Sequence, residues 1–570
     1  FDALGTSGID RIEISRGAGA SLIAPEAIGG VVNIIRKKAT EDSSTINFSL
    51  GDHGYKLFSG TVTKVNEKGS AGTTFSAQYN EQGQVDTDDN GINESPKIGS
   101  YVLAGKHYID FNPRNNLTFD VTSLKSSTFG GPMNKANFQP TVNTGGSPTF
   151  EDNDVRKKYT GKTEQVTEII EIQRNEATIA FTHQINDYSN FVLKQSYAQQ
   201  IQDSWYEGSD YYHKNQTLFS DVQYNNQVSD NHFITVGVDN KDENLKSQSE
   251  AFYVVAGRDR DDYEYQSLGL YLRDIWTPSS NVELATAVRV NKITTDWTDQ
   301  LAAGDEIDKT IVSPRFHLKW GHTDYLTSRL GAGVGYRAPL TFFESEHGIL
   351  DDGFDVNVSK LEESESFSYS LSYESDRFIA NGGATHTIVE NLAYVDDSGS
   401  IPELRNTSQV VHVTNYDVTF GYQVTKPLSL GLSYEYFDYD DQYKSLLTLA
   451  AIEQRIKFDI EYETDRFFVS FLMTWIGSRD LKEYGYSDRF NVSTGSDAKS
   501  TDAESYFTLD LKLAYNLSKN YKVYTGIKNL LDETQDESPL FFDSDGEFDV
   551  THIYGPLRGR QLYAGLQASF

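Results

Sequence analysis

Residues able to do covalent chemistry are few in this sequence, and they do not form a recognisable catalytic pattern. The chain contains no cysteine, so a thiol nucleophile, a disulfide and a thiolate metal site are excluded. Its 11 histidines are scattered without metal-ligand spacing, and there is no G-x-S-x-G nucleophile motif. Glu283, Asp459 and Glu461 resemble paired catalytic acids, but solvated or ion-paired carboxylates are the better interpretation. The sequence therefore predicts a protein that is not an enzyme and that uses no cofactor.

Aromatic and arginine side chains gather in four polar segments, where they suit noncovalent binding. The segments are Trp205–His213 (WYEGSDYYH), Arg258–Tyr265 (RDRDDYEY), Tyr336–Glu362 and Tyr436–Tyr443 (YFDYDDQY). Rings and guanidinium groups recognise anionic ligands through cation–π contacts and charged hydrogen bonds. The same residue types also form aromatic girdles and solvated loops, so both interpretations stand. We predict ligand contacts from Tyr206, Tyr211, Tyr212, Arg258, Arg260, Tyr336, Arg337 and His347.

The charge balance is strongly acidic. The chain has 83 Asp and Glu against 50 Lys and Arg, a net charge of −33, which argues against a nucleic-acid partner. Acidic loops would either capture cations or keep the surface solvated. Asp86–Asn93 (DTDDNGIN) and Asp351–Asp355 offer oxygen ligands for Ca²⁺, but neither has the spacing of a known calcium loop. We predict no specific metal site.

Apolar and polar side chains alternate with a period of two from about Thr45 onward, as in β-strands. Ser267–Arg273, Arg455–Tyr462 and Thr508–Tyr515 each have one apolar face and one face with polar or charged residues. The mean hydropathy is −0.52, and no run approaches the ~20 apolar residues of a spanning helix. Membrane β-barrels have this weak signal. Marking the alternating segments predicts about 22 strands, among them 216–227 and 281–293.

Short turns alternate with long polar connections along the chain. Turns such as Asn112–Arg114 and Thr277–Ser280 are built from residues typical of tight hairpins, whereas 126–175 and 240–264 are long. A β-sandwich shares the strand alternation but has no reason to gather its long loops at one end. A barrel in an asymmetric membrane does. The last strand, Arg560–Phe570, ends on an aromatic residue, which is typical of outer-membrane barrels.

A barrel of about 22 strands has a lumen too wide for its own side chains to fill. The chain must then supply a plug, and Ile9–Lys38 is the stretch that does not resemble barrel wall. It has two β-branched runs separated by the turn Arg16–Gly19 and the pair Gly29–Gly30. We therefore predict an all-β, antiparallel transmembrane barrel (residues 40–570) with long extracellular loops. Residues 1–39 are predicted to belong to a plug inside the lumen.

Three motifs occur together in this chain. Within the opening stretch, DRIEISRG leads through a Gly-Gly step to VVNI, with Arg11, Glu13, Arg16, Gly17, Gly29, Gly30 and Asn33 as the marked positions. Ser313–Arg315 precedes Gly335–Pro339 (GYRAP), and Gly526–Asp532 (GIKNLLD) precedes Gly555–Phe570. Together these motifs resemble the plug end, the late-barrel segment and the C-terminal signature of TonB-dependent outer-membrane receptors.

This resemblance implies active import of a scarce, bulky nutrient, most often a ferric siderophore, across the outer membrane of a Gram-negative bacterium. TonB, with ExbB and ExbD, would supply the energy, and the chain would be a monomer surrounded by outer-membrane lipid and lipopolysaccharide. Haem, cobalamin or a glycan are alternative cargoes, and a passive porin or surface-binding barrel is an alternative function. By the same resemblance, residues 1–39 are the C-terminal part of a plug, and most of it, with its TonB box, would precede Phe1.

Two details of the motifs bear on mechanism. We predict that Arg16 and Glu13 form ion pairs with wall residues such as Glu283 or Arg289, with ordinary solvated charge as the alternative. The pair Gly29–Gly30 is predicted to permit close packing where the plug meets the wall. Family members that bind haem place a histidine after the GYRAP-like motif, as His347 stands here, but their second box is replaced by VSKL at 358–361.

Overall fold

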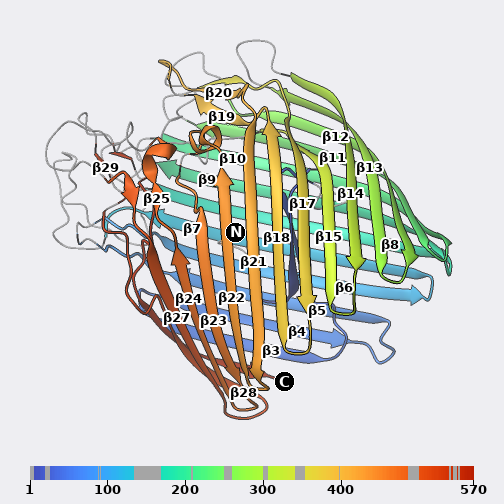
Figure 1. The fold of residues 1–570 in the computed structure, drawn as a ribbon, viewed down its shortest axis with the longest axis horizontal. Coiled ribbons are helices and arrows are strands. Elements are labelled where there is room, and N and C mark those ends of the chain that lie inside the picture. The colour runs from blue at the N-terminus through green and yellow to red at the C-terminus, as the bar shows by residue number, and fades with distance from the viewer. Residues whose placement is uncertain are drawn as a thin grey trace.

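Twenty-two antiparallel strands close into a single barrel in the computed structural model (Figure 1). The structure describes residues 5–18, 26–87, 89, 92–133, 168–206, 209–249, 260–298, 306–340, 354–396, 398–447, 449–485, 500–537, 539, 541–542, 548–549 and 552–570. Each barrel strand pairs with the barrel strand before it and the one after it, and the last pairs with the first. The predicted all-β barrel of about 22 strands is confirmed.

The first half of the barrel consists of β3 (Ser43–Gly51), β4 (Lys56–Val65), β5 (Ala71–Gln82), β6 (Lys97–Asn112), β7 (Asn115–Gly130), β8 (Glu168–Asn186), β9 (Ser189–Tyr206), β10 (Ser209–Ser229), β11 (His232–Ser249), β12 (Tyr263–Ser279) and β13 (Val282–Trp297). The second half consists of β14 (Glu306–Gly321), β15 (Leu326–Arg337), β17 (Glu362–Glu374), β18 (Phe378–Glu390), β21 (Val411–Thr425), β22 (Leu428–Tyr439), β23 (Gln454–Glu463), β24 (Phe467–Ile476), β27 (Tyr506–Asn516), β28 (Tyr521–Lys528) and β31 (Gln561–Ser569). Strand β31 closes the barrel, because the backbone N–H and C=O of Phe570 and Ser44 bond to each other at 2.8 Å.

The outside of the barrel is apolar. On β12, the outward-facing Leu268, Leu270 and Leu272 are half exposed, whereas Tyr271, which points inward, is almost fully buried. On β13, the guanidinium of Arg289 is buried inside while its apolar neighbours face out. A water-soluble protein would bury the leucines instead. An apolar belt around a closed barrel is the surface expected in contact with lipid hydrocarbon.

The strands run farther toward the long-loop end than the alternation predicts. Strand β10 begins at Ser209 instead of position 216, and β13 ends at Trp297 instead of position 293. In this upper part of β13, Ile293 and Trp297 are buried on the lumen side, while Lys292 and Asp296 point outward. The outward apolar face therefore stops before the hydrogen-bonded ladder does, so hydropathy alone could not locate these strand ends.

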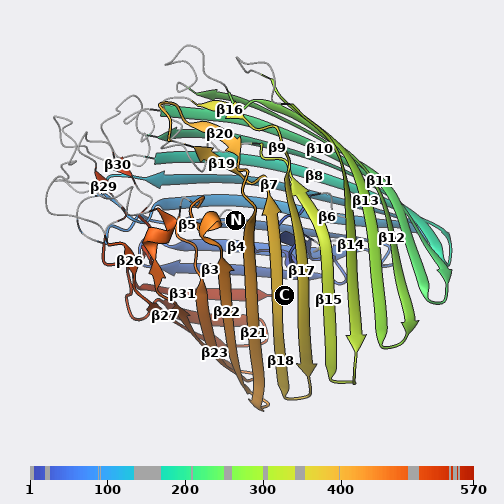
Figure 2. The same cartoon turned by 45° about the horizontal axis from the view of Figure 1, so that its top comes forward.

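Small elements cluster at the long-loop end (Figures 1 and 2). They are the sheet β16 (Asp355–Asn357), β20 (Glu403–Asn406) and β19 (Ala393–Asp396), the pairs β25 (Arg479–Asp480) with β26 (Asp502–Ala503) and β29 (Phe541–Phe542) with β30 (Phe548–Asp549), and the helices α4 (Asp441–Lys444) and η1 (Leu481–Tyr484). No helix among the described residues combines the length and apolarity needed to cross a bilayer.

A two-stranded hairpin lies inside the barrel, separate from its wall. It consists of β1 (Ile9–Arg16) and β2 (Gly30–Arg36). Both strands are drawn dark blue in Figures 1 and 2. The two strands pair antiparallel, with Ile12 opposite Ile34 and Ile14 opposite Val32. We call this element the lumenal hairpin.

Placing a charge in the apolar belt tests which face meets lipid. Replacing Leu270 by arginine should destabilise the barrel in lipid vesicles, lowering its free energy of unfolding by about 2–3 kcal/mol, because a guanidinium would sit in hydrocarbon. Gln266 lies on the same face of β12, four residues nearer the long-loop end, where polar residues point outward. Gln266→Arg is therefore the control. We measure stability by urea unfolding in vesicles and expect the unfolding midpoint of this control to stay close to that of the wild type. Equal effects of both changes would contradict this placement of the membrane.

Candidate functional site

Glycines shape the turn end of the lumenal hairpin. Gly30 has φ +146°, and a Cβ there would lie 2.4 Å from the backbone oxygen of Ser15 on the paired strand. Gly17 has φ +82° and passes close to Ser366 on the barrel wall. A Cβ on Gly29 would meet no atom within 4 Å. The close approach expected at the Gly-Gly pair is thus made by Gly30 alone, and it lies within the hairpin.

Arg16 anchors the hairpin to the wall. Its Nη1 donates to Asn415 Oδ1 at 2.5 Å and to Asp417 Oδ1 at 3.2 Å, and its Nη2 donates to Glu435 Oε1 at 2.6 Å. These three acceptors come from the adjacent strands β21 and β22, and we call them the Arg16 cage. The other oxygen of Glu435 accepts from Arg455 Nε at 2.9 Å. One carboxylate therefore joins the hairpin to a second wall strand, β23.

The partners suggested for Arg16 from sequence are wrong, although the type of contact is right. Arg289 donates to Asp239 at 2.5 Å deep in the wall of β11–β13. Glu283 is exposed near the turn that opens β13. Both residues sit on strands far from β21 and β22 around the barrel, so neither can reach Arg16.

Glu13 does not contact the wall in the described structure. It accepts from Arg11 Nε at 2.7 Å and from Asn33 Nδ2 at 3.1 Å, so its bonds stay within the hairpin. The hydrogen bond from Arg11, followed by that from Asn33, lowers the pKa of the Glu13 carboxyl. Arg11 also pairs with Asp10 at 3.0 Å. These surface contacts stabilise the hairpin itself and do not fix it in the lumen.

Two further ion pairs attach the lumenal hairpin and its loop to the barrel wall. One of them uses a residue that was not predicted from the sequence. Lys241 Nζ contacts Glu26 at 3.0 Å, and the hydroxyl of Tyr265 donates to the same carboxylate. Arg36 Nε donates to Asp120 at 3.0 Å. Glu26 is the only acidic residue between Glu13 and Glu41. That isolation in an otherwise apolar and basic stretch was the signal available in the sequence.

The wall passes close to the described ends of the hairpin loop at Gly335. A Cβ there would lie 1.8 Å from the carbonyl oxygen of Ala27 and 3.0 Å from the Cβ of Ala18. Close by, Ala18 N donates to Ser366 Oγ at 2.8 Å. The glycine of the GYRAP motif therefore has a packing role, because any side chain would occupy the space of the loop.

The predicted ligand residues differ widely in accessibility. Tyr336 is fully buried, and Tyr211 is almost fully buried with its hydroxyl donating to Asp261 Oδ2 at 2.6 Å. Tyr212 and Arg260 are half-buried. The Arg337 side chain is 51% exposed, and its Nε donates to the buried Glu362 at 2.5 Å. Arg258, His347 and the side chain of Tyr206 lie outside the described residues.

Three rings of the segment Tyr436–Tyr443 form a row, in which one pair is stacked and the next is tilted at 38°. Phe437 and Tyr439 lie parallel, with centroids 5.7 Å apart and planes at 4°, and Tyr439 meets Tyr443 of α4, also at 5.7 Å. All three rings are half-buried. Phe437 and Tyr439 share the strand face of Glu435, which belongs to the Arg16 cage. We call these three residues the aromatic ladder. Tyr436 points the other way and stacks on Tyr416.

Charged contacts hold the end of the ladder in place. Lys444, next to Tyr443, bonds to Glu453 at 2.8 Å and to Glu483 of η1. Tyr484 donates to Glu453 at 2.8 Å. Burial alone would lower the pKa of the Lys444 ammonium, but the hydrogen bonds to Glu453 and Glu483 outweigh it and raise the pKa. Lys444 is therefore charged at neutral pH, and it ties two loops together.

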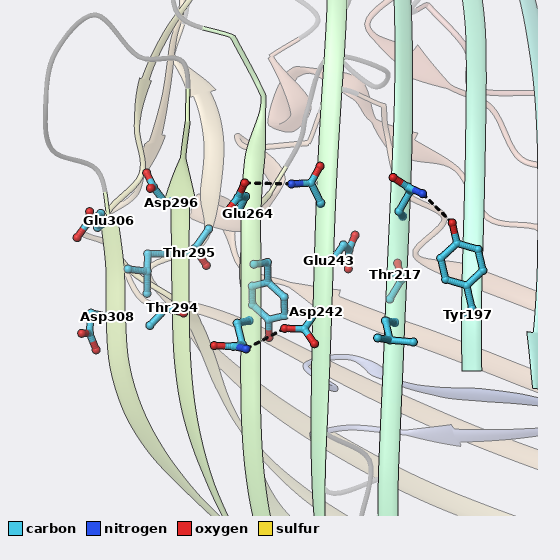
Figure 3. A pocket seen from close by; sticks show the side chains of 16 residues that line it. Tyr197, Thr217, Asp242, Glu243, Glu264, Thr294, Thr295, Asp296, Glu306 and Asp308 are labelled. Carbon is cyan, nitrogen blue, oxygen red and sulfur yellow. Dashed lines mark hydrogen bonds between the residues drawn. The ribbon is translucent and has the colours of Figure 1, made fainter. Parts of the chain in front are cut away.

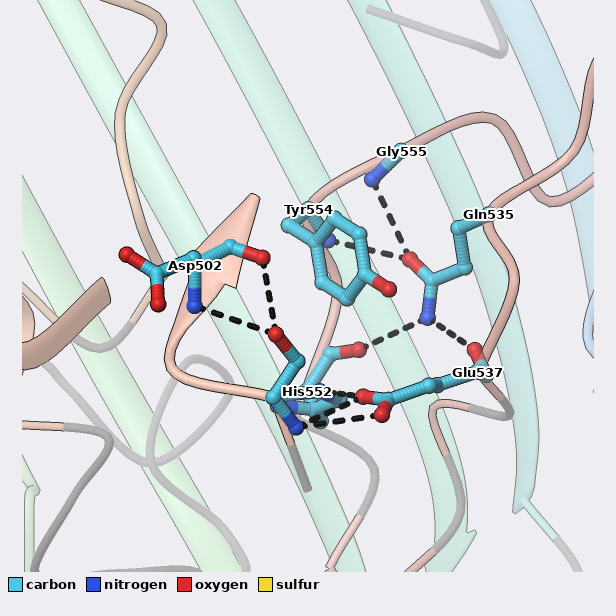
Figure 4. Close-up of polar contacts among 7 residues, drawn as sticks. Asp502, Gln535, Glu537, His552, Tyr554 and Gly555 are labelled. Carbon is cyan, nitrogen blue, oxygen red and sulfur yellow. Dashed lines mark hydrogen bonds and ion pairs between the residues drawn. The ribbon is translucent and has the colours of Figure 1, made fainter. Parts of the chain in front are cut away.

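A second polar cluster joins loops near the chain's C-terminal end (Figure 4). The amide oxygen of Gln535 accepts from the backbone N–H of Tyr554, and its Nε2 donates to the backbone oxygen of His552 at 2.9 Å. Glu537 pairs with His552 Nε2 at 3.0 Å and accepts from the backbone N–H of Ser500. His552 is fully buried. These contacts join Ser500, the segment 535–537 and the segment 552–554, so the cluster serves as a clamp between loops.

A hollow of about 670 Å³ lies on the outer side of β9–β14 (Figure 3). Its rim carries carboxylates, of which Asp242 accepts from Gln266 at 2.8 Å and Glu264 from Asn244 at 3.3 Å. These residues share the outward face of their strands with the apolar belt, so the hollow does not open to the lumen. No group of three or more potential metal ligands occurs among the described residues. The contacts between the lumenal hairpin and the wall form the candidate site.

Comparison with known proteins identifies relatives of this chain. The profile of the family described as "TonB dependent receptor-like, beta-barrel" matches residues 100–530. The siderophore receptor PirA from Acinetobacter baumannii superposes with a TM-score of 0.75 at 16% identity, over 100% of this chain and 86% of that chain. The ferric enterobactin receptor PfeA from Pseudomonas aeruginosa, in complex with enterobactin, gives 0.75 and 16%, over 100% and 87%. At this identity the likeness shows the fold alone.

Among curated relatives, the vitamin B12 transporter BtuB of Vibrio cholerae is 35% identical over 111 residues. The matched region is 18% of this chain and 18% of the relative, so the alignment spans less than a fifth of the length of the curated relatives it matches.

Proposed function

The chain belongs to the TonB-dependent receptor-like β-barrel family, and we propose that it imports a ferric siderophore across the outer membrane by TonB-dependent active transport. The Arg16 cage is the observation that carries this proposal. Arg16 is 42% exposed and Asp417 35%, so these ion pairs are wet and give way under a modest pull. A hairpin held in the lumen by such contacts suits a gate that opens under force.

Residues 1–39 would act in this scheme as the C-terminal part of a plug, with residues 40–570 as the barrel. One face of the lumenal hairpin supports this division, because Ile12, Ile14 and Val32 on it are 52%, 70% and 44% exposed. An apolar sheet face of this kind needs cover, which a further plug segment would supply. TonB, acting with ExbB and ExbD, would pull through that segment. Residence as a monomer in outer-membrane lipid and lipopolysaccharide belongs to the same proposal.

Growth on defined iron sources tests the proposed cargo. Expression in a strain lacking its own receptors should restore growth on at least one ferric siderophore, and the rescue should require TonB. The matched control is the same strain without the gene. Rescue that persists without TonB would indicate a passive pore and would overturn the proposal. Rescue by no iron source would point to another cargo.

Cobalamin is the second candidate cargo. The local identity of 35% with a vitamin B12 transporter is the specific observation in its favour. Cobalamin-dependent growth of a strain lacking its own cobalamin transporter would decide between the two cargoes. Haem and glycans remain further cargo alternatives, and no observation in the described residues favours a glycan.

A further inference from the structure

Two neighbouring strands of the barrel, β14 and β15 (Figure 1), separate in their upper parts. Their pairing rises from the short turn between them and ends where Arg315 lies opposite Gly333. Above this point, and among the described residues, Glu306–Pro314 of β14 pair with β13 alone and Val334–Arg337 of β15 pair with β17 alone. Pro314 stands at the break and has no backbone N–H to donate. We call this break in the wall the seam.

The two sides of the seam overlap. On β15, Tyr336 shares the strand face of Leu330, which points outward and is 43% exposed. Tyr336 is nevertheless fully buried, in one core cluster with Ile307 and Ile311 from the inward face of β14. The outward face of β15 therefore packs against the inward face of β14. The upper part of β15 lies on the lumen side of β14.

An ion pair crosses the seam. Lys309, on the inward face of β14, donates to Glu363, which shares the outward face of β17 with Phe367. The contact joins β14 to β17 although β15 stands between them in the order of the barrel, as the overlap requires. The two side chains are 42% and 28% exposed, so the ion pair is partly wet and holds the overlap weakly.

The ends of the hairpin loop cover the opposite side of β15 and β17. The hydroxyl of Ser364 donates to the backbone oxygen of Ile28 at 3.3 Å, and Ala18 N donates to Ser366 Oγ at 2.8 Å. Ser364 lies opposite Gly335 in the pairing of β15 with β17, and Gly335 is the residue that faces the loop. The upper parts of β15 and β17 are therefore held between β14 on the outside and the loop on the inside.

We propose that Val334–Arg337 of β15 and Glu362–Ser366 of β17 form a movable flap in the barrel wall, whose position follows the lumenal hairpin. In a closed barrel, backbone hydrogen bonds hold a strand on both sides, and each bond contributes about 1 kcal/mol. The flap lacks such pairing toward β14 among the described residues, so it can leave β14 by breaking side-chain contacts alone. Withdrawal of the hairpin frees the flap and lets the upper lumen change its width. The inference goes beyond the proposed function, because it names no cargo and holds for any cause of hairpin movement.

Removing the ion pair across the seam tests whether the flap can move. Hydrogen exchange of the purified full chain in detergent measures the opening of the flap amides. Lys309→Ala should accelerate their exchange by about tenfold, because side-chain contacts hold the flap to β14. Lys292→Ala is the matched control, since it removes an ion pair with Asp308 that lies across the continuous pairing of β13 and β14. The amides beside Lys292 should exchange within about twofold of the wild-type rate.

Overpacking the contact between the hairpin loop and the flap tests whether the two move together. Ala18 is fully buried against Gly335 and Ser366, so Ala18→Leu must displace the loop, the flap or both. We expect the amides of β1, β2 and the flap to exchange faster in parallel, by about tenfold. Gly29→Ala is the control, because a Cβ there meets nothing within 4 Å. Heat-modifiable migration in gels verifies that each variant has folded as a barrel.

The outcomes separate the flap from the proposed function. Wild-type exchange of the flap in Lys309→Ala would overturn the flap, and so would an equal acceleration beside Lys292 in the control variant. Faster exchange of the hairpin or of the flap alone in Ala18→Leu would overturn the coupling between them. Wild-type exchange of both elements in that variant would overturn it as well. The proposed function is tested separately, by the TonB-dependent growth rescue, and its failure would leave the exchange results unaffected.

Discussion

Replacing Gly335 by valine should displace the hairpin loop from the barrel wall and abolish the ordered position of the lumenal hairpin. A Cβ at position 335 would lie 1.8 Å from the carbonyl oxygen of Ala27, far inside van der Waals contact. Gly335 sits in the regular strand β15, so valine suits its backbone and the clash alone carries the effect. Overpacking against backbone should cost about 3 kcal/mol or more. Hydrogen exchange of the β1 and β2 amides should accelerate by about a hundredfold.

Gly29→Ala is the matched control for this change. It lies in the same contact region, but a Cβ there meets nothing within 4 Å. We expect its hairpin amides to exchange at the wild-type rate. The hairpin amides of Gly335→Val could instead be as well protected from hydrogen exchange as those of the wild type. That result would mean that the loop does not pass Gly335 in the membrane-embedded protein.

Replacing Glu435 by alanine should weaken the attachment of the lumenal hairpin by about 1 kcal/mol, because it removes the charged hydrogen bond from Arg16, which is 42% exposed. Arg16 would keep Asn415 and Asp417, whereas Arg455 would lose its carboxylate partner. Single-molecule pulling on the N-terminal end should show a lower extraction force than in the wild type. Raising the salt concentration should reduce the difference in extraction force between Glu435→Ala and the wild type, because salt screens the ion pairs that the wild type still has.

Glu461→Ala is the control for Glu435. Glu461 is an acid on the neighbouring strand β23, and among the described residues it makes no contact with the hairpin. Its removal should leave the extraction force unchanged. An unchanged force in Glu435→Ala, or in Arg16→Ala, would show that the Arg16 cage does not hold the hairpin.

The barrel could be predicted from sequence because side-chain direction in a strand is a local property. Leu268, Leu270 and Leu272 must share one face whatever the rest of the chain does. Turn residues and connection lengths then separated a membrane barrel from a sandwich. The strand ends near Ser209 and Trp297 escaped prediction, because above the membrane the apolar side chains change faces and the pattern no longer marks the strand.

The attachment of the hairpin could be predicted only in kind. Arg16 was expected to meet wall acids, yet Asp417 and Glu435 lie 401 and 419 positions away in the sequence. Which strand faces the hairpin depends on the tilt and register of every strand between them. Glu26 and Gly335 were not assigned these roles for the same reason. Each contacts a partner that barrel closure brings into place.

The sequence by itself determined the number and polarity of the strands, the absence of thiol chemistry and the family motifs. These follow from residue types and from a period of two along the chain, which no distant contact can alter. Only the tertiary structure decided that Tyr336 is buried while the Arg337 side chain is 51% exposed, and that Phe437, Tyr439 and Tyr443 lie in a row beside the Arg16 cage. The physical reason is that contacts across a lumen are set by barrel circumference and strand shear, which are properties of the closed sheet as a whole.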